Sequence, residues 1–241
     1  MAHILPISPD SLQRASDIIH SGGLVAFPTE TVYGLGADAF QEEACKKIYA
    51  AKGRPKNNPL IVHTYSFEKA LSLTALTPNS WQWDAFHALG KLWPAPLTLV
   101  VPAAPIFPST VTAGLPTVAL RVPQSQAALA FLRAVDVPIA APSANRSSYV
   151  SPTMAQHVAE DLGESVELIL DGGDALFGLE STIVSLGQKK ALLLRPGAMT
   201  FEELKEILPE LSYPSQRTSQ EHSQNPLAPG QLALHYSPNT P

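Results

Sequence analysis

Cysteine is almost absent from this sequence. Cys45 is the only one in 241 residues, so no disulfide can form within the chain. Its spacing from Ile48 on a predicted helix indicates a small buried hydrophobic residue and not a nucleophile. Because a chain without disulfides suits a reducing compartment, we expect a cytoplasmic protein.

Long apolar runs are also lacking. No stretch approaches the roughly 20 apolar residues of a membrane-spanning helix, although 45% of all residues are hydrophobic. The first residues, MAHILP, do not open with the basic segment and long apolar segment of a signal peptide. We therefore expect a soluble globular protein with no membrane partner.

Positive charge is scarce as well. The chain has 16 Lys and Arg residues against 21 Asp and Glu residues, a formal net charge of −5. A nucleic-acid-binding surface normally needs an excess of basic residues to neutralise phosphates, so we expect direct RNA binding to be weak or absent. The most suggestive basic residues are Lys52, Arg54, Lys56, Arg121 and Arg195. This grouping suits a small polyanion such as ATP better than a long duplex.

Several common catalytic motifs are missing. The chain contains no Walker-type Gly-Lys-Ser/Thr, no HExxH and no CxxC. These absences argue against a P-loop ATPase, a zinc protease and a dithiol redox enzyme.

The most informative stretch that is present is FPTETVYGLG at residues 27–36. It follows a short apolar run at residues 24–27, which predicts a buried strand, and it carries three hydroxyls and one carboxylate. Its glycines, Gly34 and Gly36, permit a positive φ or the close approach of a ligand to the backbone. We interpret it as a binding loop; the alternative is an ordinary strand-to-loop turn.

Three further polar clusters follow apolar runs. They are KGRPKNNP at 52–59, PSANRSS at 142–148, and EST at 180–182 together with LRPG at 194–197. Ligands of α/β proteins collect outside strand ends, so these loops predict one shared site built from distant parts of the chain.

Helices and strands alternate only loosely, which predicts an α/β domain on a twisted mixed sheet. Helices are expected at 9–21, 42–51, 80–92, 126–135, 152–162 and 201–208, the first capped by Ser8 and the last by Thr200. Strands are expected at 24–27, 60–63, 97–101, 117–122, 138–141, 166–170, 181–186 and 192–195. The composition after residue 208 shifts to Pro, Ser and Gln, which indicates an extended linker.

The motifs PTETVYGLG, KGRPKNNPL, PSAN, STIV and LRPG, in this order, closely resemble the YrdC-like family of L-threonylcarbamoyladenylate synthases. The resemblance covers about residues 5–208 and implies a single YrdC-like domain with a concave cavity on its sheet. PGQLALHYSP at 229–238 is similar to the linker of longer, two-domain members. The resemblance thus implies the linker-containing type, here without its C-terminal domain, with residues 209–241 as a linker and lid over the nucleotide.

The resemblance also implies an activity. Threonylcarbamoyl-AMP and pyrophosphate would be made from L-threonine, bicarbonate and ATP, with Mg²⁺ accompanying ATP, and a downstream tRNA threonylcarbamoyl transferase complex would use the product. Two alternatives stay open. One is a carbamoyl-adenylate-forming enzyme of the hydrogenase-maturation type, against which the single cysteine counts; the other is a non-catalytic double-stranded RNA-binding module, against which the negative charge counts.

Individual roles follow from the same resemblance. A catalytic role is implied for Lys52 and Arg54. ATP contacts are implied for Arg54, Asn58, Thr117, Ser143, Asn145, Ser151, Arg195 and Tyr236. Contacts with L-threonine are implied for Thr31, His63, Arg121, Ala141 and Ser181.

The residues alone leave other interpretations open for several of these positions. Lys52 and Arg54 could compensate a helix dipole, and His63 could be a structural strand-end residue. Arg121, in an apolar strand, needs an anion, which could be a structural carboxylate or the substrate's own. Glu30 could cap backbone amides, so no general base is assigned, and no metal ligand is identified.

Overall fold

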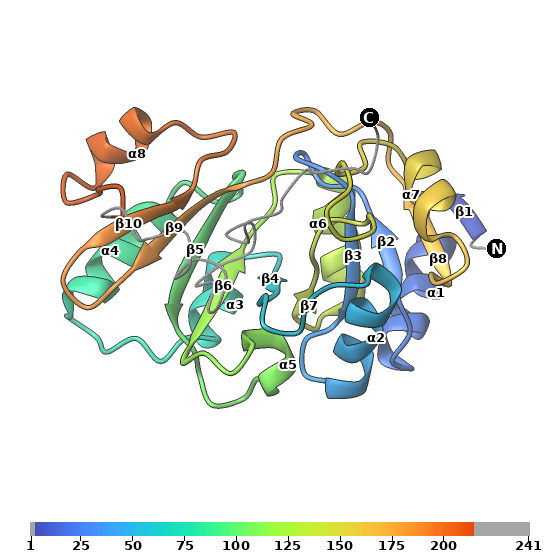
Figure 1. The fold of residues 1–241 in the computed structure, drawn as a ribbon, viewed down its shortest axis with the longest axis horizontal. Helices are drawn as coiled ribbons and strands as arrows, with labels where there is room; N and C mark the ends of the chain where they lie inside the picture. The colour runs from blue at the N-terminus through green and yellow to red at the C-terminus, as the bar shows by residue number, and fades with distance from the viewer. Residues whose placement is uncertain (1–2, 215–241) are drawn as a thin grey trace.

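Figure 1 shows the computed structural model, which describes residues 3–214. Within these residues ten strands form one sheet in the order β1-β8-β2-β3-β7-β4-β6-β5-β9-β10. The predicted linker and lid segment, including Tyr236, lies outside the described residues from position 215 onward. None of the helices in residues 3–214 combines the length and apolar character that crossing a bilayer requires.

The element bounds are as follows. The strands are β1 (His3–Pro6), β2 (Val25–Phe27), β3 (Gly34–Asp38), β4 (Ile61–His63), β5 (Leu97–Pro102), β6 (Thr117–Arg121), β7 (Ile139–Ala140), β8 (Leu168–Asp171), β9 (Thr182–Leu186) and β10 (Ala191–Arg195). The helices are α1 (Pro9–His20), α2 (Glu42–Lys52), α3 (Phe67–Ser72), α4 (Trp81–Gly90), α5 (Ser109–Thr112), α6 (Gln126–Val135), α7 (Ala155–Leu162) and α8 (Phe201–Ile207).

The sheet is mixed, as predicted. Parallel pairs are β1 with β8, β8 with β2, β4 with β6, and β5 with β9, while the remaining neighbours are antiparallel. Figure 1 shows α1 and α7 near the β1 end of the sheet and α4 and α8 near the β10 end. The predicted α/β fold on a mixed sheet is therefore confirmed.

Local signals explain several helix ends. Ser8 and Ser11 form a reciprocal capping box at the start of α1, and Thr200 and Glu203 form one at the start of α8. Gly53 ends α2 in the left-handed conformation, with a φ of 60°. Cys45 is fully buried on α2, where its thiol donates to the Asp38 carbonyl, and burial raises its pKa to about 12. The predicted caps at Ser8 and Thr200 and the predicted burial of Cys45 are confirmed.

The second half of the predicted binding loop is in fact a strand. Gly34 and Gly36 belong to β3, and neither has a positive φ. A Cβ on Gly36 would lie 2.8 Å from Cγ2 of Ile139 and 3.1 Å from the Phe27 ring. Gly36 is therefore required by close packing of the core, not by a turn or by a ligand. The strand β1 and the short helices α3 and α5 were also not predicted.

Candidate active site

The polar clusters found in the sequence meet at one pocket. All four clusters contribute lining residues, namely Thr29, Thr31, Val32, Gly34, Arg54, Pro142, Ser143, Glu180, Ser181 and Arg195. Ile61, His63, Arg121 and Ala141, which lie outside these clusters, complete the lining. The predicted convergence of distant loops on a shared cavity is confirmed.

Strand register explains the floor of this pocket. His63 on β4 pairs with Arg121 on β6, and Arg121 pairs with Thr98 on β5. Because side chains alternate between the faces of a sheet, directly paired residues share a face. Two positions away along each strand, Ile61, Ala119 and Val100 also pair, and with Ile183 they form a small apolar cluster. The pocket face thus carries a polar row beside an apolar one.

The loop between β2 and β3 forms one wall, and Thr29 organises it. The Thr29 hydroxyl donates to the Val32 carbonyl at 2.6 Å and accepts from the backbone N–H groups of Thr31 and Val32. Residues 142–144 form the next wall and are bound to this loop and the start of β3, since Leu35 N donates to Pro142 O and Ala144 N donates to Tyr33 O. Backbone bonds thereby hold the motifs PTETVYGLG and PSAN side by side.

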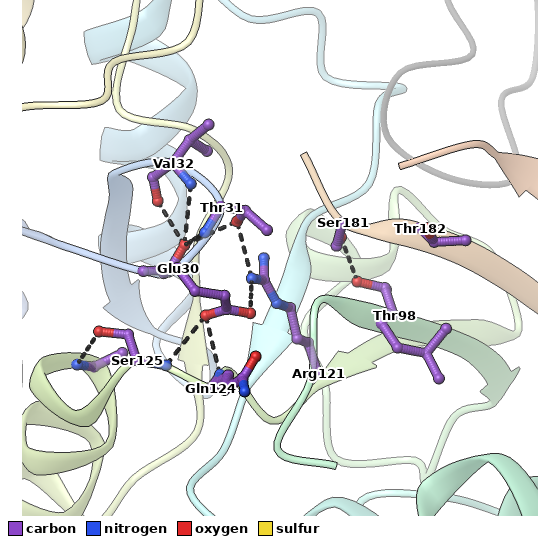
Figure 2. A network of polar contacts seen from close by, with 12 residues as sticks. Glu30, Thr31, Val32, Thr98, Arg121, Gln124, Ser125, Ser181 and Thr182 are labelled. Carbon is purple, nitrogen blue, oxygen red and sulfur yellow. Dashed lines mark hydrogen bonds and ion pairs between the residues drawn. The ribbon is translucent and has the colours of Figure 1, made fainter. Parts of the chain in front are cut away.

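Arg121 is buried, with 4% exposure, and has a structural counterion. Its Nη2 donates to Glu30 Oε1 at 2.6 Å and to the Thr31 hydroxyl at 2.9 Å, as Figure 2 shows. The carboxylate partner left open by the sequence is therefore present. Within the described residues the buried Nε atom has no hydrogen-bond partner, and Arg121 still lines the pocket. As a cation that lines the pocket, Arg121 can attract a second anion.

His63 is buried beside Arg121 and faces the same cavity. Burial, followed by the nearby Arg121 charge, lowers the pKa of His63 to about 3. The imidazole is therefore neutral at physiological pH. Its ring meets the Phe27 ring edge to face, with centroids 5.9 Å apart, and within the described chain Nδ1 has no hydrogen-bond partner. The pocket is thus lined by an uncharged imidazole.

Ser181 joins two parts of the site. Its hydroxyl lies 2.8 Å from the Thr98 hydroxyl beneath it, and Arg195 Nη2 donates to the same oxygen at 3.1 Å. Figure 2 shows the pair of Thr98 and Ser181 next to Arg121. Thr98 has 0% exposure, so its hydroxyl acts only through Ser181.

Arg195 is held from two sides. Its guanidinium donates to the Ser181 carbonyl through Nε and Nη2 and forms an ion pair with Glu180. A Cβ on Gly197 would lie 2.4 Å from the Glu180 carbonyl oxygen, so only glycine allows the LRPG segment this close to residues 180–182. The glycine thus fixes where Arg195 enters the pocket.

Arg54 belongs to the same charged side of the pocket. Its Nε and Nη2 atoms donate to the carbonyl oxygens of Asn58 and Pro59, at 3.2 and 2.9 Å. Burial lowers the pKa of Arg54 to about 10, so it remains a cation. The Asn58 side chain is buried, and within the described residues its Oδ1 atom has no partner.

Lys52 does not line the pocket. Its Nζ atom donates to the Ser143 carbonyl at 2.7 Å and to both the backbone carbonyl and the side-chain oxygen of Asn145. Burial lowers the pKa of Lys52 to about 7. The structure therefore places this predicted catalytic residue behind the 143–145 loop, where it supports the wall of the pocket.

The other predicted ATP residues are distributed around the site. Asn145 and Ser151 line a second pocket, and the Ser151 hydroxyl donates to Glu180 Oε1 at 3.3 Å. Thr117 lines neither pocket. It begins β6, about 13 Å along the strand from Arg121. Thr98 was not predicted as a site residue, and the alternation Thr98-Leu99-Val100 was the available signal. Glu180 was predicted only as part of the EST cluster, without a role of its own.

Comparisons with known proteins agree with this geometry. A model of the Sua5, YciO and YrdC proteins, described as telomere recombination, matches residues 17–197. The chain is 44% identical to the threonylcarbamoyl-AMP synthase of Pyrococcus abyssi, over 95% of this chain and 66% of that protein. It is 42% identical to the enzyme of the same name from Bacillus subtilis, over 98% of this chain and 67% of that protein.

Solved structures give the same result. The crystal structure of P. abyssi Sua5 complexed with L-threonine superposes with a TM-score of 0.91 and 42% identity, covering 99% of this chain and 70% of that one. The chain thus spans about two thirds of the length of these relatives.

Proposed function

Because the chain belongs to the Sua5/YciO/YrdC family, we propose that it is an L-threonylcarbamoyladenylate synthase. It would convert L-threonine, bicarbonate and ATP into threonylcarbamoyl-AMP and pyrophosphate. The observation that carries the proposal is a single pocket with Arg121 and neutral His63 at one part and Arg54 and Arg195 at another. Such a pocket can hold an amino acid next to a polyphosphate.

The amino acid would bind at Arg121. A guanidinium that still has a free donor can take the threonine carboxylate, while Thr31, His63 and Ser181 offer polar groups to the side-chain hydroxyl and amine. Ile61 and Ala141 offer apolar surface for the methyl group. Support comes from the relative whose crystal structure is described as complexed with L-threonine.

ATP would bind toward Arg54 and Arg195. Both are cationic groups at the pocket. Hydrogen bonds to backbone carbonyls already hold each guanidinium in place, so little rearrangement is needed to receive phosphates. Ser143 lines the same pocket, and Asn145 and Ser151 line the second one, which offers neutral donors for ribose or base.

The reaction needs two bonds to form. The unprotonated threonine nitrogen attacks the carbon of bicarbonate, whose C–OH bond breaks so that water leaves with one amine proton, or it attacks carbon dioxide and gives up one proton to solvent. Either route gives an N-carboxylate. A carboxylate oxygen then attacks the α-phosphorus of ATP, and pyrophosphate leaves with the P–O bond electrons. Holding both reactants in one pocket supplies much of the rate enhancement through proximity. Arg54 and Arg195 would stabilise the charge that develops on the phosphates.

Mg²⁺ is proposed to arrive with ATP. Within the described residues no three His, Cys, Asp or Glu side chains gather closely enough to hold a metal ion. Mg²⁺ that accompanies ATP is bound mainly by phosphates and water, with one or two protein carboxylates. Glu180 is the carboxylate that lines the pocket and would be that ligand. When bound, the ion supplies charge neutralisation to the phosphates.

The product would be used by a downstream tRNA threonylcarbamoyl transferase complex, since threonylcarbamoyl-AMP is an activated group donor. A cytoplasmic location and weak or absent direct tRNA binding go with this proposal and with the net charge of −5.

The test is substrate-dependent formation of the adenylate. Purified protein should release pyrophosphate from ATP only when L-threonine, bicarbonate and Mg²⁺ are all present, and mass spectrometry should detect threonylcarbamoyl-AMP. Serine should bind more weakly by on the order of 1 kcal/mol, the value of one methyl contact, and valine should bind more weakly still. Pyrophosphate release that follows carbamoyl phosphate instead, or RNA binding without any release, would overturn the proposal in favour of the alternatives.

A further inference from the structure

Glu30 has its side chain buried behind the pocket, with 6% exposure, and its carboxylate is fully engaged. Oε1 accepts from Arg121 at 2.6 Å, and Oε2 accepts from the backbone N–H groups of Gln124 and Ser125, at 3.0 and 3.2 Å. Figure 2 shows this arrangement, with Glu30 between Arg121 and the turn that precedes α6. Glu30 does not line the pocket, so it does not reach a substrate itself.

These contacts, together with one to its backbone carbonyl, bind three segments to Glu30. Arg121 ends β6, Ser125 caps α6, and the Glu30 backbone carbonyl accepts from Phe177 N at 2.9 Å. The anion also lies at the N-terminus of α6, where the helix dipole favours negative charge. Glu30 is thus better placed to hold other groups than to move a proton.

Arg121, the partner of Glu30, would be unfavourable as a buried charge without a counterion. An unpaired guanidinium in this position would carry a large desolvation penalty, and it could turn toward other acceptors when no substrate is present. Glu30 and Thr31 take Nη2 alone, so the orientation of the guanidinium is set while Nε keeps no partner among the described residues. The Arg121 site is therefore organised before a ligand arrives.

We infer that Glu30 is a positioning residue that presents Arg121 to the carboxylate of the amino-acid substrate. The inference rests on the proposed function and deepens it. The affinity of the Arg121 site for the substrate carboxylate would depend on Glu30, a residue that the substrate does not touch. It also answers the question of a general base in the first loop: Glu30 is committed to Arg121 and to two backbone amides.

The test compares Glu30→Gln with Glu167→Gln by isothermal titration and by steady-state kinetics. Glu167 is a matched control, since its carboxylate also accepts a backbone N–H, from Leu24 at 2.9 Å, but outside the pocket. Glu30→Gln should raise the Kd and the KM for L-threonine at least tenfold and leave the Kd for ATP within about twofold, because only the Arg121 site loses its charge-assisted contact. Glu167→Gln should leave both affinities unchanged.

Glu30→Asp provides a second variant that keeps the charge. Its shorter side chain cannot reach Arg121 and the two amides together, so the Kd for L-threonine should rise several-fold, less than in Glu30→Gln. Should Glu30→Gln not fold, Glu30→Asp carries the test alone.

The outcomes separate clearly. Unchanged L-threonine affinity in a folded Glu30 variant overturns the inference, and so does a parallel loss of ATP affinity, which would indicate a purely structural residue. If the parent protein itself does not bind L-threonine, the proposed function fails first, and the inference fails with it.

Discussion

Lys52 and Ser143 are joined by a hydrogen bond of 2.7 Å from the Lys52 ammonium to the Ser143 carbonyl. The link is reciprocal along the loop, because Ser147 N donates to the Lys52 carbonyl at 2.8 Å. The C-terminal end of α2 is thereby fixed to the segment that follows β7 and forms a wall of the pocket. Lys52 belongs to the KGRPKNNP motif, which suggested phosphate binding, but its ammonium binds the backbone of the PSAN motif.

We predict that Lys52→Met weakens ATP binding through this wall. Methionine keeps the length of the side chain but removes the donors to three oxygen atoms, so unfolding should become easier by about 1–3 kcal/mol. Lys47→Met is the matched control, since Lys47 lies on the same helix and donates to the Gly22 carbonyl at 2.6 Å, away from the pocket. Calorimetry should show a higher ATP Kd only for Lys52→Met. Equal ATP affinity in the two variants would contradict the prediction.

We predict that replacing the pocket arginines one at a time weakens the binding of different substrates. Arg121→Ala should weaken L-threonine binding with little effect on ATP, whereas Arg54→Ala and Arg195→Ala should do the reverse. Each loses a charge-assisted contact, so the affected binding free energy should fall by roughly 1.5–3 kcal/mol. Titrations of each variant with both ligands measure this. Loss of folding in all three variants would show that the arginines serve the structure instead.

Much of the fold follows from local signals in the chain, and the failures have physical causes. The caps at Ser8 and Thr200 mark helix starts because their side chains satisfy free backbone N–H groups. β3 was not predicted, since a segment with Gly34 and Gly36 has a low intrinsic preference for a strand. Its extended form comes from pairing with β2 on one side and with β7 on the other, and β7, at Ile139–Ala140, is far away in the sequence.

The sequence predicted which motifs form the site but not which of their side chains face the pocket. Arg54, Arg121 and Arg195 line the pocket, while Lys52, from the same motif as Arg54, points behind it. Which side chain of a loop faces a cavity is decided by tertiary contacts and not by composition. The Glu30 partner of Arg121 is 91 residues away in the chain, so no local pattern could assign it.

Thr98 should matter through Ser181. Thr98→Val preserves the shape of the buried side chain but removes the hydroxyl 2.8 Å from Ser181 Oγ, so Ser181 should lose its fixed orientation. We expect the L-threonine affinity to fall by about 1 kcal/mol, or roughly fivefold. Thr110→Val is the control, because the buried Thr110 hydroxyl has no partner in the described part of the chain. A Thr98→Val variant with parental L-threonine affinity would exclude this role.

Folding stability should depend on pH through His63. Its pKa falls to about 3 in the folded state from the ordinary value of 6.5. Between these values the unfolded chain binds a proton at this residue and the folded chain does not, so stability falls as the pH falls below 6.5. The contribution changes by about 1.4 kcal/mol per pH unit, or about 2 kcal/mol between pH 7 and pH 5.

His63→Gln removes this group, so its urea unfolding free energy should fall by about 2 kcal/mol less than that of the parent on going from pH 7 to pH 5. The carboxylates that also titrate in this range are shared by both proteins, and their effects cancel in the comparison. His157→Gln, at an exposed position on α7, should behave like the parent. An equal loss of stability in parent and His63→Gln would mean that the folded protein accepts the proton at His63, and the neutral imidazole assigned to the pocket would then be wrong.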